Sequence, residues 1–399
     1  MKVVDFEMPN DDDPRRQAVR AWLAAHPSPS GRRLAEAGWV VPHWPKPYGL
    51  DADPVHQIII DEEFAKAGVA RPSNPIGIGW AAPTILMAGT EAHKDRYLWP
   101  ALSGEEFWCQ LFSEPDAGSD LASLSTRAVR DGEEWVLNGS KIWTSGAHLA
   151  QFGILLARTN PDAPKRKGIS YFICPMHAPG ITMAPIVDMT GAHSFNQVFF
   201  DDARIPADCL VGDVNDGWRL AKATLANERV SLSSGGVLWG SGPSAADLIE
   251  VVRNGGAGAA VRADPVIRQE LARTWIEGEV LRLIQLRALS ARLSGRTPGP
   301  EASVQKLMAD EHGQRVMALA KQLAGPGGML DGSGPVGKLP PRRRGGATEI
   351  KFAEGLVPGV ERVWHYGYLF APALTIGGGT WAVQRNIIAE WVLGLPRDP

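Results

Sequence analysis

The fold of this chain is decided by residues 112–145, which begin Phe-Ser-Glu-Pro-Asp-Ala-Gly-Ser-Asp (112–120) and end Asn-Gly-Ser-Lys-Ile-Trp-Thr-Ser (138–145). In the first run Pro115 restricts the backbone and Gly118 permits an unusual backbone angle, so nearby hydroxyl and N–H groups can converge on an oxygen-rich ligand. In the second run Asn138-Gly139 stands between apolar residues and predicts a hairpin turn. The strand after that turn would present a Trp and two hydroxyls, which suit the stacking and hydrogen bonding of a flavin ring.

The composition excludes several classes of function. The chain has 399 residues and 44% apolar content, enough for two or three cores, and its formal net charge of −3 provides no basic field for nucleic acid. Its three cysteines form no CxxC motif and its nine histidines no HExxH pair, so we expect neither disulfides nor a metal site. The acidic start lacks a signal-peptide pattern, and no apolar run reaches the roughly 18 residues of a membrane span. We therefore expect a cytoplasmic, metal-free protein.

The pattern of apolar residues along the sequence changes twice. Helical spacing dominates up to residue 107, short β-rich runs such as Phe152–Ala157 and Ile169–Cys174 occupy 108–214, and helical patterns return in 215–399. These three ranges are the expected domains. The β-rich part reads as a small antiparallel barrel or sandwich.

Together these features closely resemble the acyl-CoA dehydrogenase family. The resemblance runs from about residue 30 to the end and includes Asn386–Glu390 and Leu393–Pro396. It implies an α+β fold with an α-helical N-terminal domain, a β-barrel or sandwich middle domain and a C-terminal four-helix bundle. It also implies FAD as cofactor and the dehydrogenation of an acyl-CoA thioester to a trans-2-enoyl-CoA. Electrons would pass to an electron-transferring flavoprotein, as in fatty-acid β-oxidation.

The family's catalytic base is expected at one of two positions. Many members carry a carboxylate just before a Gly-Thr near the C-terminus, but here that position is Gly378, which has no side chain. Other members use a Glu that precedes an Arg on the first long helix of the C-terminal domain, and here that pair is Glu228-Arg229. The resemblance therefore implies Glu228 as base, Arg229 as a substrate contact, and the Gly378 N–H as a donor to the thioester carbonyl.

Helical periodicity supports this placement without the resemblance. One apolar stripe recurs every seven residues at Trp218, Leu225, Leu232 and Trp239. At about 100° per residue, Glu228 lies about 60° to one side of Leu225 and Arg229 about 40° to the other. From periodicity alone an ordinary ion pair at a helix edge is the favoured interpretation. The family pattern and the missing base at Gly378 reverse that preference.

The resemblance also implies the cofactor contacts. Phe112 and Ser113 should contact the flavin ring, Ser119 its pyrophosphate, and Trp143 and Ser145 the ring and its N5/O4 edge, with Thr144 adjacent. Thr380 should reach the phosphate or ribose region, or else simply cap a helix, and Gln322 the adenine part of the flavin in a neighbouring subunit. A homodimer, a homotetramer and a heterotetramer all fit.

Three departures from the family pattern keep other functions open. The segment 254–262 lacks the usual Arg-Phe-Gly, Trp381 is bulky, and Gly378 leaves one candidate carboxylate. The alternatives are a flavin monooxygenase or oxidase on the same fold, and a non-catalytic partner subunit of a mixed assembly. Fatty, branched and steroid-derived acyl groups fit the sequence equally well.

Overall fold

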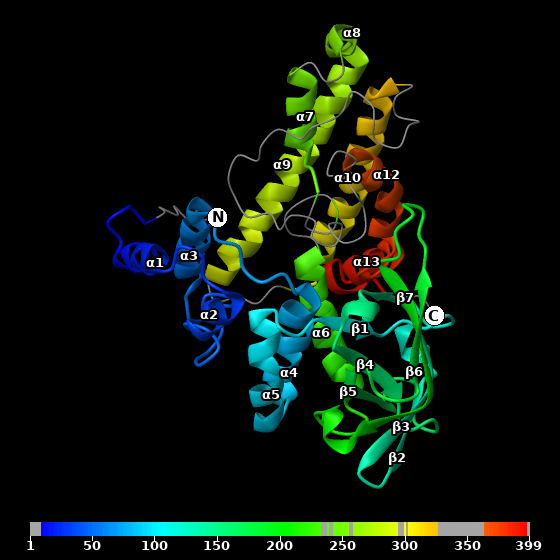
Figure 1. Cartoon of the computed structure of the whole chain (residues 1–399). Coiled ribbons are helices and arrows are strands. Elements are labelled where there is room, and N and C mark those ends of the chain that lie inside the picture. The colour runs from blue at the N-terminus through cyan, green and yellow to red at the C-terminus, as the bar shows by residue number, and fades with distance from the viewer. Residues whose placement is uncertain are drawn as a thin grey trace. The chain divides into compact units, whose positions relative to one another are not determined.

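The computed structural model describes residues 9–232, 238, 242–254, 258–293, 299–300, 302–325 and 363–396. The chain divides into two compact units. The sheet-containing unit consists of Ser28–Ala52 and Arg71–Glu228, and the helical unit of Met1–Pro27, Asp53–Ala70 and Arg229–Pro399. Figure 1 traces the elements of both units along the chain. The expected order of helices, then strands, then helices is observed.

The elements have the following bounds. The helices are α1 (Pro14–Ala25), α2 (Gly31–Glu36), α3 (Pro54–Ala67), α4 (Ala82–Ala88), α5 (Glu91–Ser103), α6 (Gly217–Leu232), α7 (Ala245–Arg253), α8 (Gly258–Ala263), α9 (Pro265–Leu293), α10 (Ala302–Leu323), α12 (Val363–Phe370) and α13 (Trp381–Ile387). The strands are β1 (Trp108–Leu111), β2 (Arg127–Asp131), β3 (Glu134–Ser145), β4 (Phe152–Arg158), β5 (Ile169–Pro175), β6 (Ile181–Ile186), β7 (Phe195–Pro206) and β8 (Leu210–Val211).

The strands form one sheet in the order β6-β7-β3-β2-β4-β5-β8, with β1 paired to β4 beside this path. Most neighbours are antiparallel, as expected, but β1 and β2 each pair with β4 in parallel. The parallel pairs correct the expectation of a purely antiparallel sheet. Inward-facing side chains such as Leu137, Leu155 and Phe172 form its buried core.

The predicted hairpin at Asn138-Gly139 is wrong. Both residues lie inside the continuous strand β3, and the turn that joins β2 to β3 lies earlier, at Gly132, where φ is 57°. At Asn138 the pairing of β3 with β7 shifts by a bulge, and the Asn138 amide bonds Asp202 on β7 at 2.9 Å. A Cβ on Gly139 would lie 2.8 Å from Thr126 Cα. The glycine is therefore required by a close backbone approach within a bulge, not by a turn.

In the helical unit α9 and α10 lie side by side, with α7 against α9 and α12 against α10 (Figure 1). Their shared core includes Leu248, Val316, Met317 and Trp364, all buried. Further along the chain, α13 and the turn before it also pack on α10. The helix α10 thereby supports the glycine run 377–379 that the sequence singled out.

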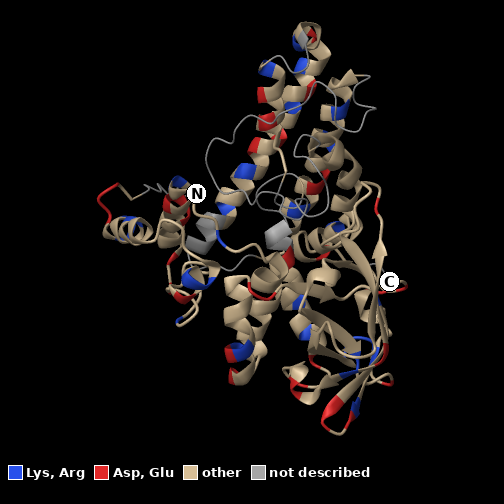
Figure 2. Cartoon of the chain, in the orientation of Figure 1, with Lys and Arg blue, Asp and Glu red and all other residues tan. Residues whose placement is uncertain are grey.

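Charges of both signs are interspersed along α9 and around the β2–β3 turn (Figure 2). Across the described ranges, no group of three or more His, Cys, Asp or Glu side chains is placed to hold a metal ion. None of the helices described combines the length and the apolar character that crossing a bilayer requires.

Candidate active site

Two buried charged residues join the two halves of the decisive stretch. Lys141 on β3 donates hydrogen bonds to the Phe112 carbonyl at 3.0 Å and to Glu114 Oε1 at 2.8 Å. Glu114 also accepts bonds from the Ser125 N–H at 2.6 Å, the Ser125 hydroxyl at 2.8 Å and the Thr126 N–H at 2.9 Å. Every bond in this cluster is charge-assisted, and those from Lys141 and from the Thr126 N–H are buried, so the cluster holds the loop that follows Phe112 firmly against β3.

The cluster keeps both groups ionised at neutral pH. Burial alone would raise the pKa of Glu114, but Lys141 and the bonds from Thr126 and Ser125 outweigh it and lower the pKa to about 2. Burial lowers the pKa of Lys141 to about 8, against the opposing attraction of Glu114. Sequence reasoning missed this pair, although a Lys at an inward position of a strand indicates a buried partner.

The strand β3 distorts where the flavin contacts are predicted. Its register against β7 shifts between Lys141 and Thr144, and Trp143 within the shift has a φ of 60° and a side chain that is 57% exposed. A left-handed backbone is costly for a bulky residue and is concentrated at functional sites. Thr144 is buried, and its hydroxyl has no hydrogen-bond partner among the described residues. An exposed indole beside an unpartnered hydroxyl fits a flat, hydrogen-bonding group such as a flavin.

The loop 112–120 lies next to this distortion. The Ser113 carbonyl accepts a hydrogen bond from the Ile142 N–H at 2.9 Å, and Phe112 packs edge-on against Tyr171 at 6.1 Å. Ser119 is exposed, whereas Ser113 and Ser145 are half-buried. The expectation of an unusual backbone angle at Gly118 is wrong, because Gly118 is not among the residues with positive φ. A Cβ at Gly118 would also meet no atom within 4 Å.

Glu228 lies on α6 and is only 6% exposed. Its Oε2 accepts a hydrogen bond from Gln110 Nε2 on β1 at 3.2 Å. Gln110 is a residue that sequence reasoning missed, since a single Gln in an apolar strand carries no distinctive signal. The side chain of the adjacent Arg229 lies outside the described residues, as do the side chains of the rest of α6. Trp239 of the predicted stripe also lies outside them.

The buried face of α6 differs from the predicted stripe. Trp218 and Leu225 are half-buried, while Leu220 and Thr224 have no exposed surface. Thr224 is buried despite its hydroxyl because Thr84 bonds it at 2.8 Å and Tyr171 at 3.2 Å. Glu228, one turn further on, therefore lies on the buried face itself and not beside it.

In the helical unit, buried donors hold the carbonyls of the glycine run. Lys306 on α10 donates to the Leu374 carbonyl at 2.9 Å and to the Gly377 carbonyl at 2.7 Å. Gln384 Nε2 donates to the carbonyls of Gly378 and Gly379, at 3.2 Å each. Gly378 has a φ of 68° and Gly379 a φ of 92°, values that favour glycine.

Three further observations complete the helical unit. Lys306 also pairs with Asp310 at 2.5 Å, and burial raises the pKa of Asp310 to about 7 against the attraction of Lys306. Thr380 caps α13, since its hydroxyl accepts the Val383 N–H at 3.3 Å. This helix has only 7 residues, so its dipole can add little to an anion site. Gln322 is exposed near the end of α10.

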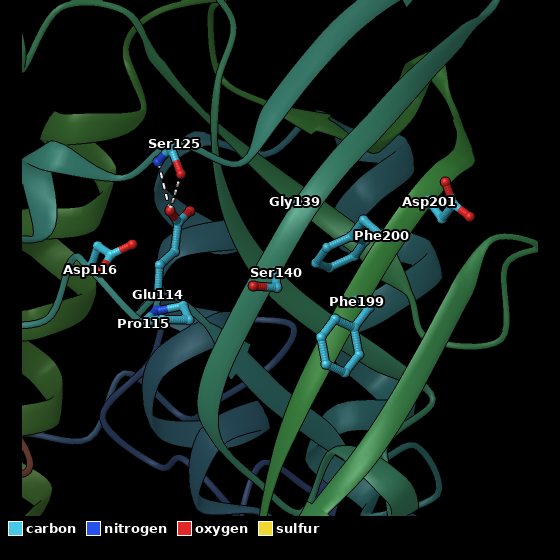
Figure 3. Close-up of a pocket in the computed structure, with 9 residues that line it drawn as sticks. All are labelled: Glu114, Pro115, Asp116, Ser125, Gly139, Ser140, Phe199, Phe200 and Asp201. Carbon is cyan, nitrogen blue, oxygen red and sulfur yellow. Dashed lines mark hydrogen bonds between the residues drawn. The ribbon is translucent and has the colours of Figure 1, made fainter.

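A cavity of about 520 Å³ lies between Glu114 and the strands β3 and β7 (Figure 3). Figure 3 shows the Glu114 carboxylate bonded to Ser125, with Phe199 and Phe200 of β7 across the cavity. Its walls also include Asp116 and Asp201 but no Lys or Arg. Carboxylates repel a pyrophosphate, so this cavity does not suit the phosphates of a flavin dinucleotide.

The site residues predicted from the sequence thus fall on both units. The sheet-containing unit brings together Phe112, Ser113, Trp143, Thr144 and Ser145 through Lys141, Glu114 and the backbone bond from Ile142. The same unit carries Glu228 and Ser119, while the helical unit carries Gly378, Thr380 and Gln322.

Comparison with family models covers nearly the whole chain. The acyl-CoA dehydrogenase N-terminal, middle and C-terminal domains match residues 13–105, 109–203 and 215–393. Among curated relatives, acyl-CoA dehydrogenase FadE34 of Mycobacterium tuberculosis is 41% identical over 96% of this chain and 48% of its own length. The chain therefore spans about half of FadE34. Acyl-CoA dehydrogenase IpdE1 of the same organism is 38% identical over 95% of this chain and 88% of its own.

Solved structures agree with this assignment. A chain of the ChsE4-ChsE5 complex from Mycobacterium tuberculosis is 30% identical to this chain. The TM-score is 0.73, and the match covers 100% of this chain and 100% of that one. The Tcur3481-Tcur3483 steroid ACAD is 28% identical, with a TM-score of 0.75 over 98% of this chain and 100% of its own. The predicted resemblance and fold class are confirmed, and so is the expectation of an oxidoreductase family that implies FAD. The chain belongs to the acyl-CoA dehydrogenase family and has the three-domain fold of that family.

Proposed function

We propose that this chain is an FAD-dependent acyl-CoA dehydrogenase that converts an acyl-CoA thioester to the trans-2-enoyl-CoA, with Glu228 as base. The observation that carries the proposal is the burial of this carboxylate, 6% exposed, beside the strand that leads to Phe112. A carboxylate removed from water and held at a defined place is suited to proton abstraction. FAD, when bound, accepts the hydride that leaves the β carbon.

We assign the cofactor contacts to the residues that the family resemblance implies. Phe112 and Ser113 would contact the flavin ring, Trp143 and Ser145 the ring and its N5/O4 edge with Thr144 adjacent, and Ser119 the pyrophosphate. The unpartnered Thr144 hydroxyl and the exposed indole of Trp143 support the ring contacts. Thr380 would reach the phosphate or ribose region, and Gln322 the adenine of a flavin in a neighbouring subunit.

The residues of this chain would divide the chemistry as follows. Glu228 takes the α proton as the Cα–H bond breaks, and the electron pair of that bond becomes the new double bond while the β hydrogen leaves with its own pair. Gly378 donates its N–H to the thioester carbonyl, where negative charge develops in the transition state. Arg229, adjacent in the chain, would contact the substrate.

Partners and setting are part of the same proposal. Electrons would pass to an electron-transferring flavoprotein in the cytoplasm, and the chain would assemble as a homodimer, homotetramer or heterotetramer. The solved relative described as a steroid ACAD makes steroid-derived acyl-CoA the first substrate class to test. We keep 1–107, 108–214 and 215–399 as proposed domain boundaries.

The decisive experiment compares wild type with Glu228→Gln, titrated anaerobically with acyl-CoA thioesters while the flavin absorbance is followed. We expect the thioester to bleach the wild type and to leave the variant oxidised, because the amide cannot accept the proton. The limiting rate should fall by roughly 10²-fold or more, which is the usual contribution of a positioned base. Exposed Glu250 on α7 provides the matched control, since Glu250→Gln makes the same chemical change on another helix.

Normal turnover in Glu228→Gln would remove the base from the proposal. Rapid reoxidation of the substrate-reduced wild type by air would favour the oxidase or monooxygenase. A third outcome follows from Gly378, which leaves the chain with a single candidate base. Protein that purifies without flavin, and gains activity only with a second chain, would be a non-catalytic partner subunit.

A further inference from the structure

We propose that Gln110 is the positioning residue for the base: its side-chain amide sets where the Glu228 carboxylate points. This inference rests on the proposed function of Glu228. The observation behind it is the hydrogen bond of 3.2 Å from Gln110 Nε2 to Glu228 Oε2, which joins a strand to a helix 118 residues further along the chain.

The strand side of this contact is rigid. Gln110 lies on β1, where Trp108, Cys109 and Leu111 are fully buried and Gln110 alone is half-buried. Its backbone is held in the parallel pairing with β4, opposite Ile154. A side chain on a paired strand whose other residues are fully buried starts from a well-defined Cα position, so its amide can reach only a small region.

The helix side is held just as firmly. Thr224 lies one turn before Glu228, and its buried hydroxyl joins Thr84 of α4 and Tyr171 of β5. Tyr171 in turn packs edge-on against Phe112, two residues after Gln110 in the chain. Side chains two residues apart in an extended segment share a face. Gln110 therefore draws the carboxylate toward the face that carries Phe112, which we assign to the flavin ring.

The chemistry of the contact is that of a fixed donor on a charged acceptor. A neutral amide N–H favours the ionised carboxylate without transferring a proton to it, and it restrains rotation about the last side-chain torsion. A base restrained in this way meets the α hydrogen with less loss of freedom on binding. Gln110 thus acts through Glu228 and takes no part in bond breaking.

Two substitutions test this role in the full-length holoenzyme. Gln110→Leu removes the donor, and Gln110→Glu keeps the shape but replaces the donor by a second carboxylate. We would measure the limiting rate of flavin bleaching, the half-saturating acyl-CoA concentration, the FAD content and the pH dependence of the rate. Gln197→Leu on β7 is the matched control, because Gln197 is also half-buried in the same sheet and makes no contact with the base that the structure records.

In Gln110→Leu we expect the limiting rate to fall between roughly 10-fold and 100-fold, the loss that follows from misplacing a reacting group by about 1 Å. Substrate half-saturation and FAD content should stay unchanged, and the acid limb of the pH profile should move to higher pH. Gln110→Glu should move that limb further, because two adjacent carboxylates resist ionising together. Gln197→Leu should match the wild type in every reading.

An unchanged rate and pH profile in Gln110→Leu, with Glu228→Gln inactive, would overturn the role of Gln110 and leave the base in place. Normal turnover in Glu228→Gln would instead overturn the base assignment, and the role of Gln110 with it. If Gln110→Leu loses FAD or unfolds, Gln110→Glu decides, and an acid limb that does not move in that variant overturns the inference.

Discussion

Lys141 has no exposed surface, and its ammonium binds two oxygens of the loop that begins at Phe112. It holds the Phe112 carbonyl on one side and Glu114 on the other, two residues before the strained Trp143. A neutral side chain of similar length could fill the same space but could not hold these oxygens. Burying the ion pair therefore costs desolvation free energy, and in return the pair fixes the geometry of the loop against β3.

Lys141→Met should lower the stability of the fold. Because it leaves Glu114 buried without its partner, we expect a loss of about 3–5 kcal/mol in the free energy of unfolding, measured with denaturant. Exposed Lys222 on α6 provides the control substitution. The double variant with Glu114→Gln should lose less than the sum of the single changes. A fully additive pair would show that the two residues do not act together.

At the scale of elements, α1 and α3 are joined by a buried carboxylate in the helical unit. Glu63 on α3 bonds Arg16 at 2.5 Å and Arg20 at 2.8 Å, both from α1, and Lys66 at 2.9 Å. The hydrogen bond from Arg20, helped by Lys66 and Arg16, outweighs burial and lowers the pKa of Glu63 to about 2. The contact between the two helices thus depends on an ionised side chain.

This link predicts a specific response to acid. The pKa of Glu63 falls from 4.5 to about 2 on folding, so its contribution to stability is complete above pH 4.5 and is lost as the pH falls through about 2. Glu63→Gln should remove that dependence and flatten the unfolding free energy across this window. Exposed Glu36 on α2 offers the comparison, and Glu36→Gln should keep the wild-type slope. Identical slopes in all three proteins would contradict the assignment.

At the scale of the whole molecule, the exposed position of Gln322 bears on assembly. If Gln322 contacts the adenine of a flavin in a neighbouring subunit, the holoenzyme must be at least a dimer. We expect light scattering after gel filtration to give a dimer or larger assembly, and Gln322→Ala to weaken FAD binding. A flavin-loaded monomer with unaltered FAD affinity in the variant would contradict this proposal. Gln285 on α9 offers a control, since Gln285→Ala lies outside the predicted contacts.

Much of the site could be predicted because local motifs carry it. The runs 112–120 and 138–145 carry the family resemblance and the proposed flavin contacts, and the absence of a side chain at Gly378 points to Glu228 as the candidate base. Helical periodicity placed Glu228 beside the apolar stripe of α6, whereas the structure places it on the buried face together with Thr224. That error arose because a hydroxyl counts as polar in a sequence, while in the fold Thr84 and Tyr171 satisfy it.

The sequence by itself determined the family, the order of helices and strands, and the residue types available for chemistry. These depend on local patterns of neighbouring residues, which can be recognised without the three-dimensional structure. Only the tertiary structure decided that Asn138-Gly139 forms a bulge in β3, since that depends on its pairing with Asp202 of β7. Tertiary structure likewise placed Gln110 against Glu228 and Lys141 against Glu114. These contacts join residues far apart in the chain through buried hydrogen bonds, and no local pattern encodes which partner a buried polar group will meet.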